Sequence, residues 1–179
     1  MRFFAPSDVY LEKNSVQNHK DQLLSLGTRA FIVTGRHSSA ANGSLADVVS
    51  LLEDASVSYH IFNEVEENPS VETVAKAAEI GKAFGADFVI GIGGGQTCDI
   101  SKAVGAFYRK AFICVPTALT TDAPPSTHTV LHNPHEQPKL VVHYKNPDYV
   151  VVDTEITVQS PAWMMVSGMG DALATYIEA

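Results

Sequence analysis

A cluster of glycines after a short apolar segment is the feature that most constrains the fold. Residues 87–91 predict a buried strand, the glycines from Gly93 onward end it, and residues 97–108 carry apolar side chains at helical spacing. A strand that ends in glycines and leads into a helix lets backbone N–H groups approach a phosphate. The spacing is not Gly-x-Gly-x-x-Gly, so a tight turn without a ligand is the alternative. The phosphate-binding candidates are Gly93, Gly94, Gly95, Gln96 and Thr97.

Apolar, β-branched runs alternate with stretches of helical periodicity along the chain. Strands are predicted at residues 29–34, 57–62, 87–91, 111–115 and 149–153. Helices are predicted at residues 43–55 and 97–108, and another is expected to begin after Ser70 as its N-cap. This order predicts an α/β fold: a Rossmann-like parallel sheet with helices on both faces, which binds ligands at the carboxyl ends of its strands.

A β-hairpin is expected to be inserted before the last strand. Residues 127–132 and 139–144 have strand character and flank a turn with two prolines. A long helix is predicted from near Pro161 to the end of the chain. No repeat or linker divides the chain before Asp153, so one compact domain is expected there.

Composition excludes several classes of function. The net charge of -8 and the lack of Lys and Arg clusters argue against nucleic-acid or anionic-membrane partners. Cys98 and Cys114 lie in apolar surroundings without Cys-x-x-Cys spacing, which indicates buried, reduced thiols. No apolar run is long enough to span a bilayer or to resemble a signal peptide, so a cytoplasmic protein with a small-molecule substrate is expected.

A loop rich in hydroxyl groups follows the strand at residues 111–115. Residues 116–126 contain Thr117, Thr121 and Ser126 together with one carboxylate, Asp122. At the carboxyl end of a buried strand, these groups are placed to bind a nicotinamide, a ribose or a substrate alcohol. The alternative is that the hydroxyls satisfy their own backbone and that Asp122 forms an Asx turn.

Four motifs in order resemble the iron-containing alcohol dehydrogenase and glycerol dehydrogenase family, whose fold is shared with dehydroquinate synthase. They are the element from Gly93 to Lys102, the loop from Pro116 to Pro124, residues 145–153 and residues 168–175. They match the N-terminal half of a typical member. The resemblance implies a dinucleotide-binding domain at residues 1–160 and, at residues 161–179, the first helix of a metal-binding helical domain that is otherwise absent.

The resemblance implies hydride transfer between an alcohol or polyol carbon and NAD(P), with Zn²⁺ or Fe²⁺ polarising the oxygen. Asp122 matches a catalytic carboxylate. Asp171 matches a metal ligand whose two histidine partners belong to the later half, and Thr175 stands where the iron branch carries a further histidine, which favours the zinc pattern. A helix-N-terminal acid that interacts with the dipole is the alternative for Asp171.

The same resemblance implies cofactor contacts around the hairpin. Thr117, Thr121 and Ser126 match cofactor-binding positions, while His128 and His132 stand where glycerol dehydrogenases carry Leu and Tyr. Histidines two or four residues apart on a strand share a face, so a metal site near His135 is an alternative, as is a solvated hairpin without a ligand.

Cofactor choice depends on the end of the first predicted strand. An acid there would bind the adenosine ribose and repel a 2′-phosphate. This chain has Gly35, Arg36, Ser38 and Ser39 instead, which favours NADP over NAD. The alternatives are a solvated Arg36 and the NAD use typical of glycerol dehydrogenases.

Two branches of the family are represented along the chain. Residues 2–6, 33–35 and 65–70 resemble the iron branch, while residues 120–124 and 170–175 resemble glycerol dehydrogenase, so a chimera is one hypothesis.

A truncated or engineered fragment that binds dinucleotide or nothing, without catalysis, is the alternative function. Dehydroquinate-synthase-like or glycerol-phosphate dehydrogenase activity is the runner-up chemistry. A homo-oligomer formed through an exposed C-terminal helix is also expected.

Overall fold

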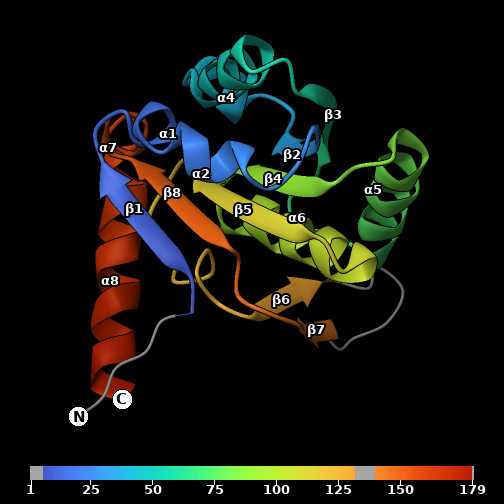
Figure 1. Ribbon diagram of the computed structural model, residues 1–179. Helices are drawn as coiled ribbons and strands as arrows, with labels where there is room; N and C mark the ends of the chain where they lie inside the picture. The colour runs from blue at the N-terminus through green and yellow to red at the C-terminus, as the bar shows by residue number, and fades with distance from the viewer. Residues whose placement is uncertain (1–5, 132–139, 179) are drawn as a thin grey trace.

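A six-stranded parallel sheet forms the centre of the molecule (Figure 1). The computed structural model describes residues 6–131 and 140–178. The strands run in the order β1-β8-β5-β4-β2-β3, and every neighbouring pair is parallel. Their bounds are β1 (Asp8–Glu12), β2 (Arg29–Gly35), β3 (Ser58–Val65), β4 (Phe88–Gly93), β5 (Ala111–Pro116) and β8 (Tyr149–Asp153). The predicted Rossmann-like class is confirmed.

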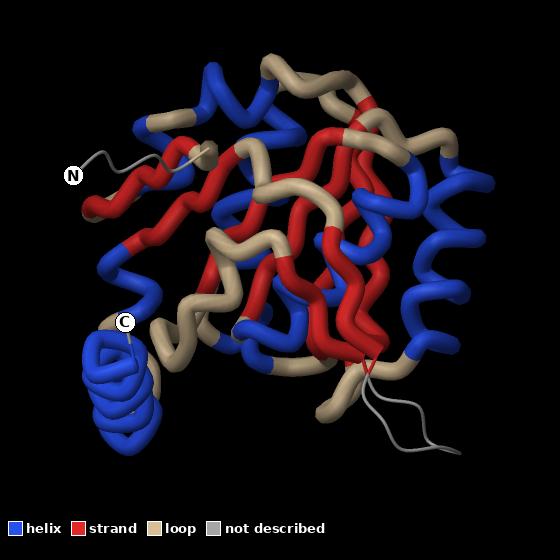
Figure 2. The backbone as a smooth tube through the Cα atoms, turned by 90° about the horizontal axis from the view of Figure 1, so that it is seen from below, coloured by secondary structure: helices blue, strands red, loops and turns tan. Residues whose placement is uncertain are grey.

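Helices cover both faces of this sheet. One face carries α1 (Ser15–Asn18), α2 (Lys20–Leu24) and α4 (Ser44–Asp54), and the other carries α5 (Val71–Phe84) and α6 (Gly95–Tyr108). Short helices follow two strands, α3 (Ser38–Ala41) after β2 and α7 (Thr154–Thr157) after β8. Figure 2, which views the molecule from below, shows α8 (Ala162–Glu178) end-on beside the sheet.

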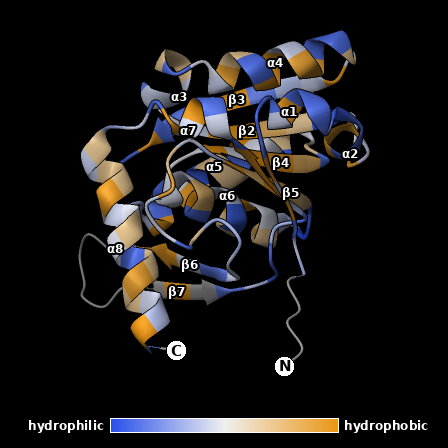
Figure 3. Ribbon diagram, turned by 90° about the vertical axis from the view of Figure 1, so that its left-hand side faces the viewer, coloured by the Kyte–Doolittle hydropathy of each residue, from blue (hydrophilic) through white to orange (hydrophobic). Residues whose placement is uncertain are grey.

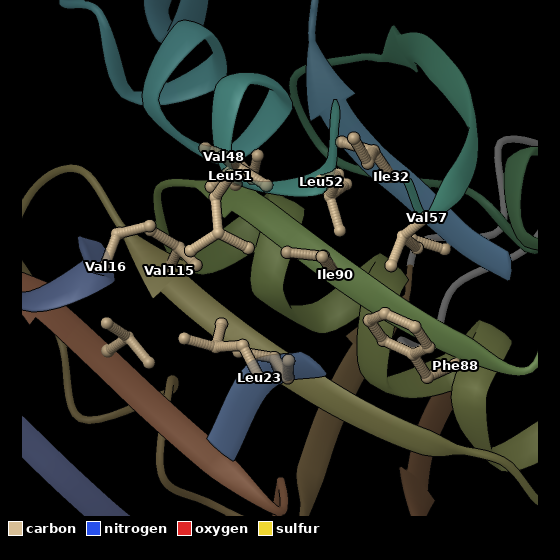
Figure 4. Close-up of a cluster of buried hydrophobic side chains, with 14 residues drawn as sticks. Val16, Leu23, Ile32, Val48, Leu51, Leu52, Val57, Phe88, Ile90 and Val115 are labelled. Carbon is tan, nitrogen blue, oxygen red and sulfur yellow. The ribbon is translucent and has the colours of Figure 1, made fainter. Parts of the chain in front are cut away.

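Burial on both faces explains why the central strands are apolar without interruption. On β2, Ile32 packs with the α1, α2 and α4 side, whereas Phe31 and Val33 pack with α5 and α6. All three are completely buried. Figure 4 shows the buried cluster on the α1, α2 and α4 side, in which Leu51 and Leu52 of α4 lie over the strands.

The strand order reverses between β2 and β4. From β2 the chain moves outward to β3, then crosses back so that β4 lies on the other side of β2, with β5 and β8 beyond it. The loops after β2 and β4 therefore diverge at the carboxyl edge, and such switch points form the ligand crevice of doubly wound sheets.

A separate antiparallel hairpin, β6 (His128–Leu131) and β7 (Leu140–His143), packs under α6. This confirms the predicted insertion. The helix predicted from near Pro161 is α8, and none of its residues is buried. Figure 3 shows hydrophobic residues in several turns along α8.

The predicted elements differ from the structure mainly at their ends. Ser70 caps α5 as expected, and its hydroxyl accepts a hydrogen bond from the Thr73 N–H at 3.1 Å. The helix predicted from residue 97 begins at Gly95, because the glycines form its first turn. The first strand, β1, was not predicted. It is a five-residue edge strand with exposed Val9 and Leu11 and lacks the apolar run of a central strand.

Candidate functional site

A cleft of about 1060 Å³ lies at the carboxyl edge of the sheet. Its walls come from the loops after four neighbouring strands, from the β6–β7 hairpin and from the start of α8. Ten of the predicted site residues line it: Gly35, Ser38, Gly94, Gly95, Gln96, Thr97, Thr121, Asp122, Ser126 and His128. The structure therefore brings together residues that are as far as 93 positions apart in the sequence.

The N-terminus of α6 opens into this cleft. Gly94 is the N-cap residue and no side chain caps the helix, so its first N–H groups lack an intrahelical partner. A Cβ added at Gly94 would meet no protein atom within 4 Å, which shows that the space in front of it is open. Free N–H groups and a positive dipole end facing a cleft suit a phosphate.

The other glycines of this segment allow close packing of α6. A Cβ at Gly91 would lie 2.1 Å from the Ser101 Oγ, and one at Gly93 would lie 2.6 Å from the Thr97 Oγ1. Gly95 approaches the loop after β5, since its Cβ would lie 2.8 Å from the Thr121 Cγ2. Gly93 itself is buried at the end of β4 and positions the helix without lining the cleft.

A buried ion pair on α6 holds the loop and the hairpin in place. The Lys102 Nζ donates to the carbonyl of Ala123 at 2.8 Å, to the Ser126 Oγ at 3.2 Å and to the carbonyl of His128. The Asp99 Oδ1 lies 2.8 Å from the same Nζ, without hydrogen-bond geometry, and the Asp99 Oδ2 accepts from the Val130 N–H. The pair therefore joins α6 to two walls of the cleft.

The hydroxyl loop presents Thr121 and the exposed Asp122 to the cleft. Among the described residues, the Asp122 carboxylate has no hydrogen-bond partner, and the turn is stabilised by the Thr121 Oγ1, which accepts from the Ala123 N–H at 3.3 Å. The proposed Asx turn at Asp122 is therefore not formed. Thr117 is buried below the cleft, where its N–H donates to the Gly93 carbonyl and its own carbonyl accepts from the Ser160 Oγ.

The residues after β2 divide between three environments. Gly35 and Ser38 line the cleft, and the exposed Arg36 lies beside it in a smaller pocket of about 290 Å³. Lys76, which is paired with Glu64 at 2.6 Å, also lines this pocket, together with Glu66 and Glu72. Ser39 is buried, and its hydroxyl is hydrogen-bonded to the Thr34 Oγ1. Ser38 and Arg36 are thus the groups placed to meet a ligand here.

The loop after β3 contributes Glu66 and Glu67, which were not predicted. Glu66 accepts hydrogen bonds from the Ser70 N–H at 3.0 Å and from the hydroxyls of Ser70 and Thr73. Burial raises the pKa of Glu66, but these hydrogen bonds outweigh it and leave the pKa below its ordinary value. The position of this loop after a strand beside β2 was the available signal.

The hairpin and α8 close two further sides. His128 of β6 and Val141 of β7 line the cleft, while His132 lies outside the described residues. Trp163, Met164 and Ser167 line it from α8. The helix comes close to the hydroxyl loop at Gly168, where a Cβ would lie 1.9 Å from the Leu119 carbonyl oxygen.

The residues present do not fit a metal site at Asp171. Asp171 is exposed in the middle of α8, which begins at Ala162, so its interpretation as a helix-N-terminal acid is wrong. The Thr175 Oγ1 donates to the Asp171 carbonyl at 3.0 Å. Within residues 6–131 and 140–178, no three His, Cys, Asp or Glu side chains gather closely enough to bind a metal.

The two cysteines lie between α6 and the sheet as free, buried thiols, which confirms the prediction. The Cys114 thiol and burial raise the pKa of Cys98 well above its ordinary value. A buried thiol of this kind is a poor nucleophile, and Cys98 is not among the residues that line the cleft. Within the described part of the chain, no helix is both long and apolar enough to cross a bilayer.

Comparison with known proteins agrees with this geometry. The family model of iron-containing alcohol dehydrogenases matches residues 6–154. A glycerol dehydrogenase from Thermotoga maritima is 49% identical over 94 residues, which is 52% of this chain and 26% of that protein. A glycolaldehyde reductase from Halobacterium salinarum is 33% identical over 183 residues, or 99% of this chain and 48% of that protein.

A solved structure shows the same fold. The crystal structure of an iron-containing alcohol dehydrogenase from Thermotoga maritima superposes with a TM-score of 0.88 at 32% identity. The match covers 96% of this chain and 53% of that protein. In both of these matches nearly all of this chain is aligned, and it spans about half the length of the other protein.

Proposed function

This chain belongs to the iron-containing alcohol dehydrogenase family, and we propose that it is the nicotinamide-dinucleotide-binding part of a metal-dependent alcohol or polyol dehydrogenase. The family consists of oxidoreductases. The observation that carries the proposal is the open N-terminus of α6, which faces a cleft at the switch point between β2 and β4. Glycerol or a similar small polyol is the proposed substrate class.

The cleft fits a dinucleotide because a phosphate can approach the backbone at Gly94 without meeting a side chain. The bound cofactor would supply the carbon that accepts or donates hydride. The residues of this chain would bind and orient it: Gly94 and Gly95 would hold the diphosphate, and the Thr121 hydroxyl lies where it can donate to a ribose or nicotinamide. The Ser126 hydroxyl already donates to the Ala123 carbonyl, so Ser126 would shape this wall of the cleft instead of donating to the cofactor. The hairpin and α8 restrict the access of water from two sides.

The cofactor proposed is NADP in preference to NAD. Arg36 is exposed beside the cleft, and Ser38 lines it at the end of β2. A guanidinium that pairs with a 2′-phosphate gains charge-assisted hydrogen bonds. We expect Arg36→Gln to weaken NADP binding about tenfold and to change NAD binding little, which parallel titrations by calorimetry would measure. Equal losses for both cofactors would reject this assignment.

Binding without catalysis is the second candidate function. It is favoured by the isolation of Asp171 from other potential ligands in the described part of the chain. Nicotinamide absorbance, followed with NADP, Zn²⁺ and glycerol, distinguishes the two functions. Turnover by this chain alone would reject binding without catalysis.

The primary test is the substitution Gly94→Ala. Its methyl group would point into the open cleft and meet no protein atom, so the fold should be unchanged while a diphosphate is excluded. We expect NADPH affinity, measured by cofactor fluorescence, to fall at least about tenfold. Gly170→Ala is the matched control, because a Cβ there also meets no protein atom but lies on α8. Equal affinity of the Gly94→Ala variant and wild type would contradict the proposal.

A further inference from the structure

Two histidines face each other across the β6–β7 hairpin. His128 is paired with His143 in the antiparallel register, and both side chains are exposed. Their ring centroids lie 4.1 Å apart, with an angle of 67° between the ring planes. Directly opposed residues of an antiparallel pair have their Cβ atoms about 4.5–5.5 Å apart, so the strand pairing itself keeps the two rings together.

The surroundings of the pair leave imidazole nitrogens available. The Nδ1 of His128 lies 3.4 Å from the Thr127 Oγ1, and its Nε2 has no hydrogen-bond partner among the described residues. A hydrogen bond at one ring nitrogen fixes the orientation in which the other can bind a metal. The backbone of His128 is also fixed, because its carbonyl accepts from the buried Lys102 ammonium.

We propose that His128 and His143 form a two-histidine site for a divalent transition-metal ion at the rim of the cleft. Metal–imidazole bonds are about 2 Å long, so rings this close can reach one ion after small side-chain rotations. Water would complete the coordination. Imidazole favours ions such as Ni²⁺, Cu²⁺ and Zn²⁺ over Mg²⁺, which prefers oxygen ligands. Because His128 lines the cleft, a bound ion would lie beside the bound dinucleotide.

The test is a calorimetric titration of tag-free protein with Ni²⁺ in the absence of nucleotide. We expect one site in the wild type, and an affinity at least about tenfold lower for His143→Gln. His143 is exposed and is not among the residues proposed to bind the dinucleotide, so this variant should fold and bind NADPH as the wild type does. Electron paramagnetic resonance with Cu²⁺ should detect two coordinating imidazoles in the wild type and one in the variant.

His37→Gln is the matched control, because His37 is also exposed but lies after β2. Its Ni²⁺ affinity should equal that of the wild type. Unchanged affinity in His143→Gln, or an equal loss in His37→Gln, would overturn the proposal. Since no nucleotide is present, either result is independent of whether the cleft binds NADP.

Discussion

Lys102 places a buried positive charge where α6, the hydroxyl loop and the hairpin meet. Its side chain is 3% exposed, and its partners lie on all three segments. Removing one member of a buried ion pair leaves the other charge uncompensated. We expect Lys102→Met to lower the free energy of unfolding by about 3–5 kcal/mol, as measured by urea denaturation.

A double variant separates this cause from loss of packing. Asp99→Leu combined with Lys102→Met removes both charges, and such apolar replacements are often close to neutral. The double variant should therefore recover the part of the loss that comes from the uncompensated Asp99 carboxylate, while the loss of the hydrogen bonds to Ala123, His128 and Val130 remains. A loss below about 1 kcal/mol in Lys102→Met, or no recovery in the double variant, would show that the pair does not hold these walls together.

For single residues, the sequence predicted which residues belong to the cleft region better than it predicted whether each one is buried, hydrogen-bonded or facing the cleft. The glycines after β4 and the hydroxyl loop were recognisable because turn chemistry is local. Ser39 was grouped with Ser38, but its hydroxyl is used by Thr34, a contact that depends on how α3 packs. Glu66 was not identified because its local sequence predicts only the start of α5, and the position of its loop after a strand beside β2 becomes evident only once the strand order is known.

Among the elements, α8 depends on a glycine for its position. Gly168 lets the helix backbone approach the Leu119 carbonyl, and Ser160 fixes the segment before α8 through the Thr117 carbonyl at 3.0 Å. An added methyl group at Gly168 must move the helix or the loop. Overpacking of this kind costs about 1–3 kcal/mol.

We therefore expect Gly168→Ala to displace α8 from the cleft and to weaken NADPH binding by up to about tenfold. Trp163, the one tryptophan of the chain, lines the cleft from α8, so its fluorescence reports both the displacement and the binding. Gly170→Ala, which meets no atom, should behave as the wild type. Identical emission and affinity in both variants would show that α8 does not form a wall of the cleft.

Hydrophobic periodicity was sufficient to predict the central strands of the sheet but not its edge strand β1. β2, β4, β5 and β8 are buried on both faces and therefore read as apolar runs. β1 could not be recognised in this way, because its exposed residues give no such run and it is held by pairing with β8, far away in the sequence.

Along the whole chain, sequence identity to known proteins is higher in one part than over the full length. The match at 49% identity covers 52% of the chain, whereas the match at 33% covers 99%. The hypothesis of a chimera of two branches stays a prediction, as does oligomerisation through α8. That helix carries exposed Trp163, Met169, Tyr176 and Ile177, an apolar surface of the kind that partner chains cover.

Hydrogen exchange of the whole chain with and without NADPH tests the central proposal most directly. Binding at the switch point should slow exchange at the amides of residues 94–97 and 120–123, which face the cleft from α6 and the hydroxyl loop. The opposite face of the sheet, under α4, should show no comparable change. No protection at saturating NADPH, or protection confined to other segments, would contradict a dinucleotide site in this cleft.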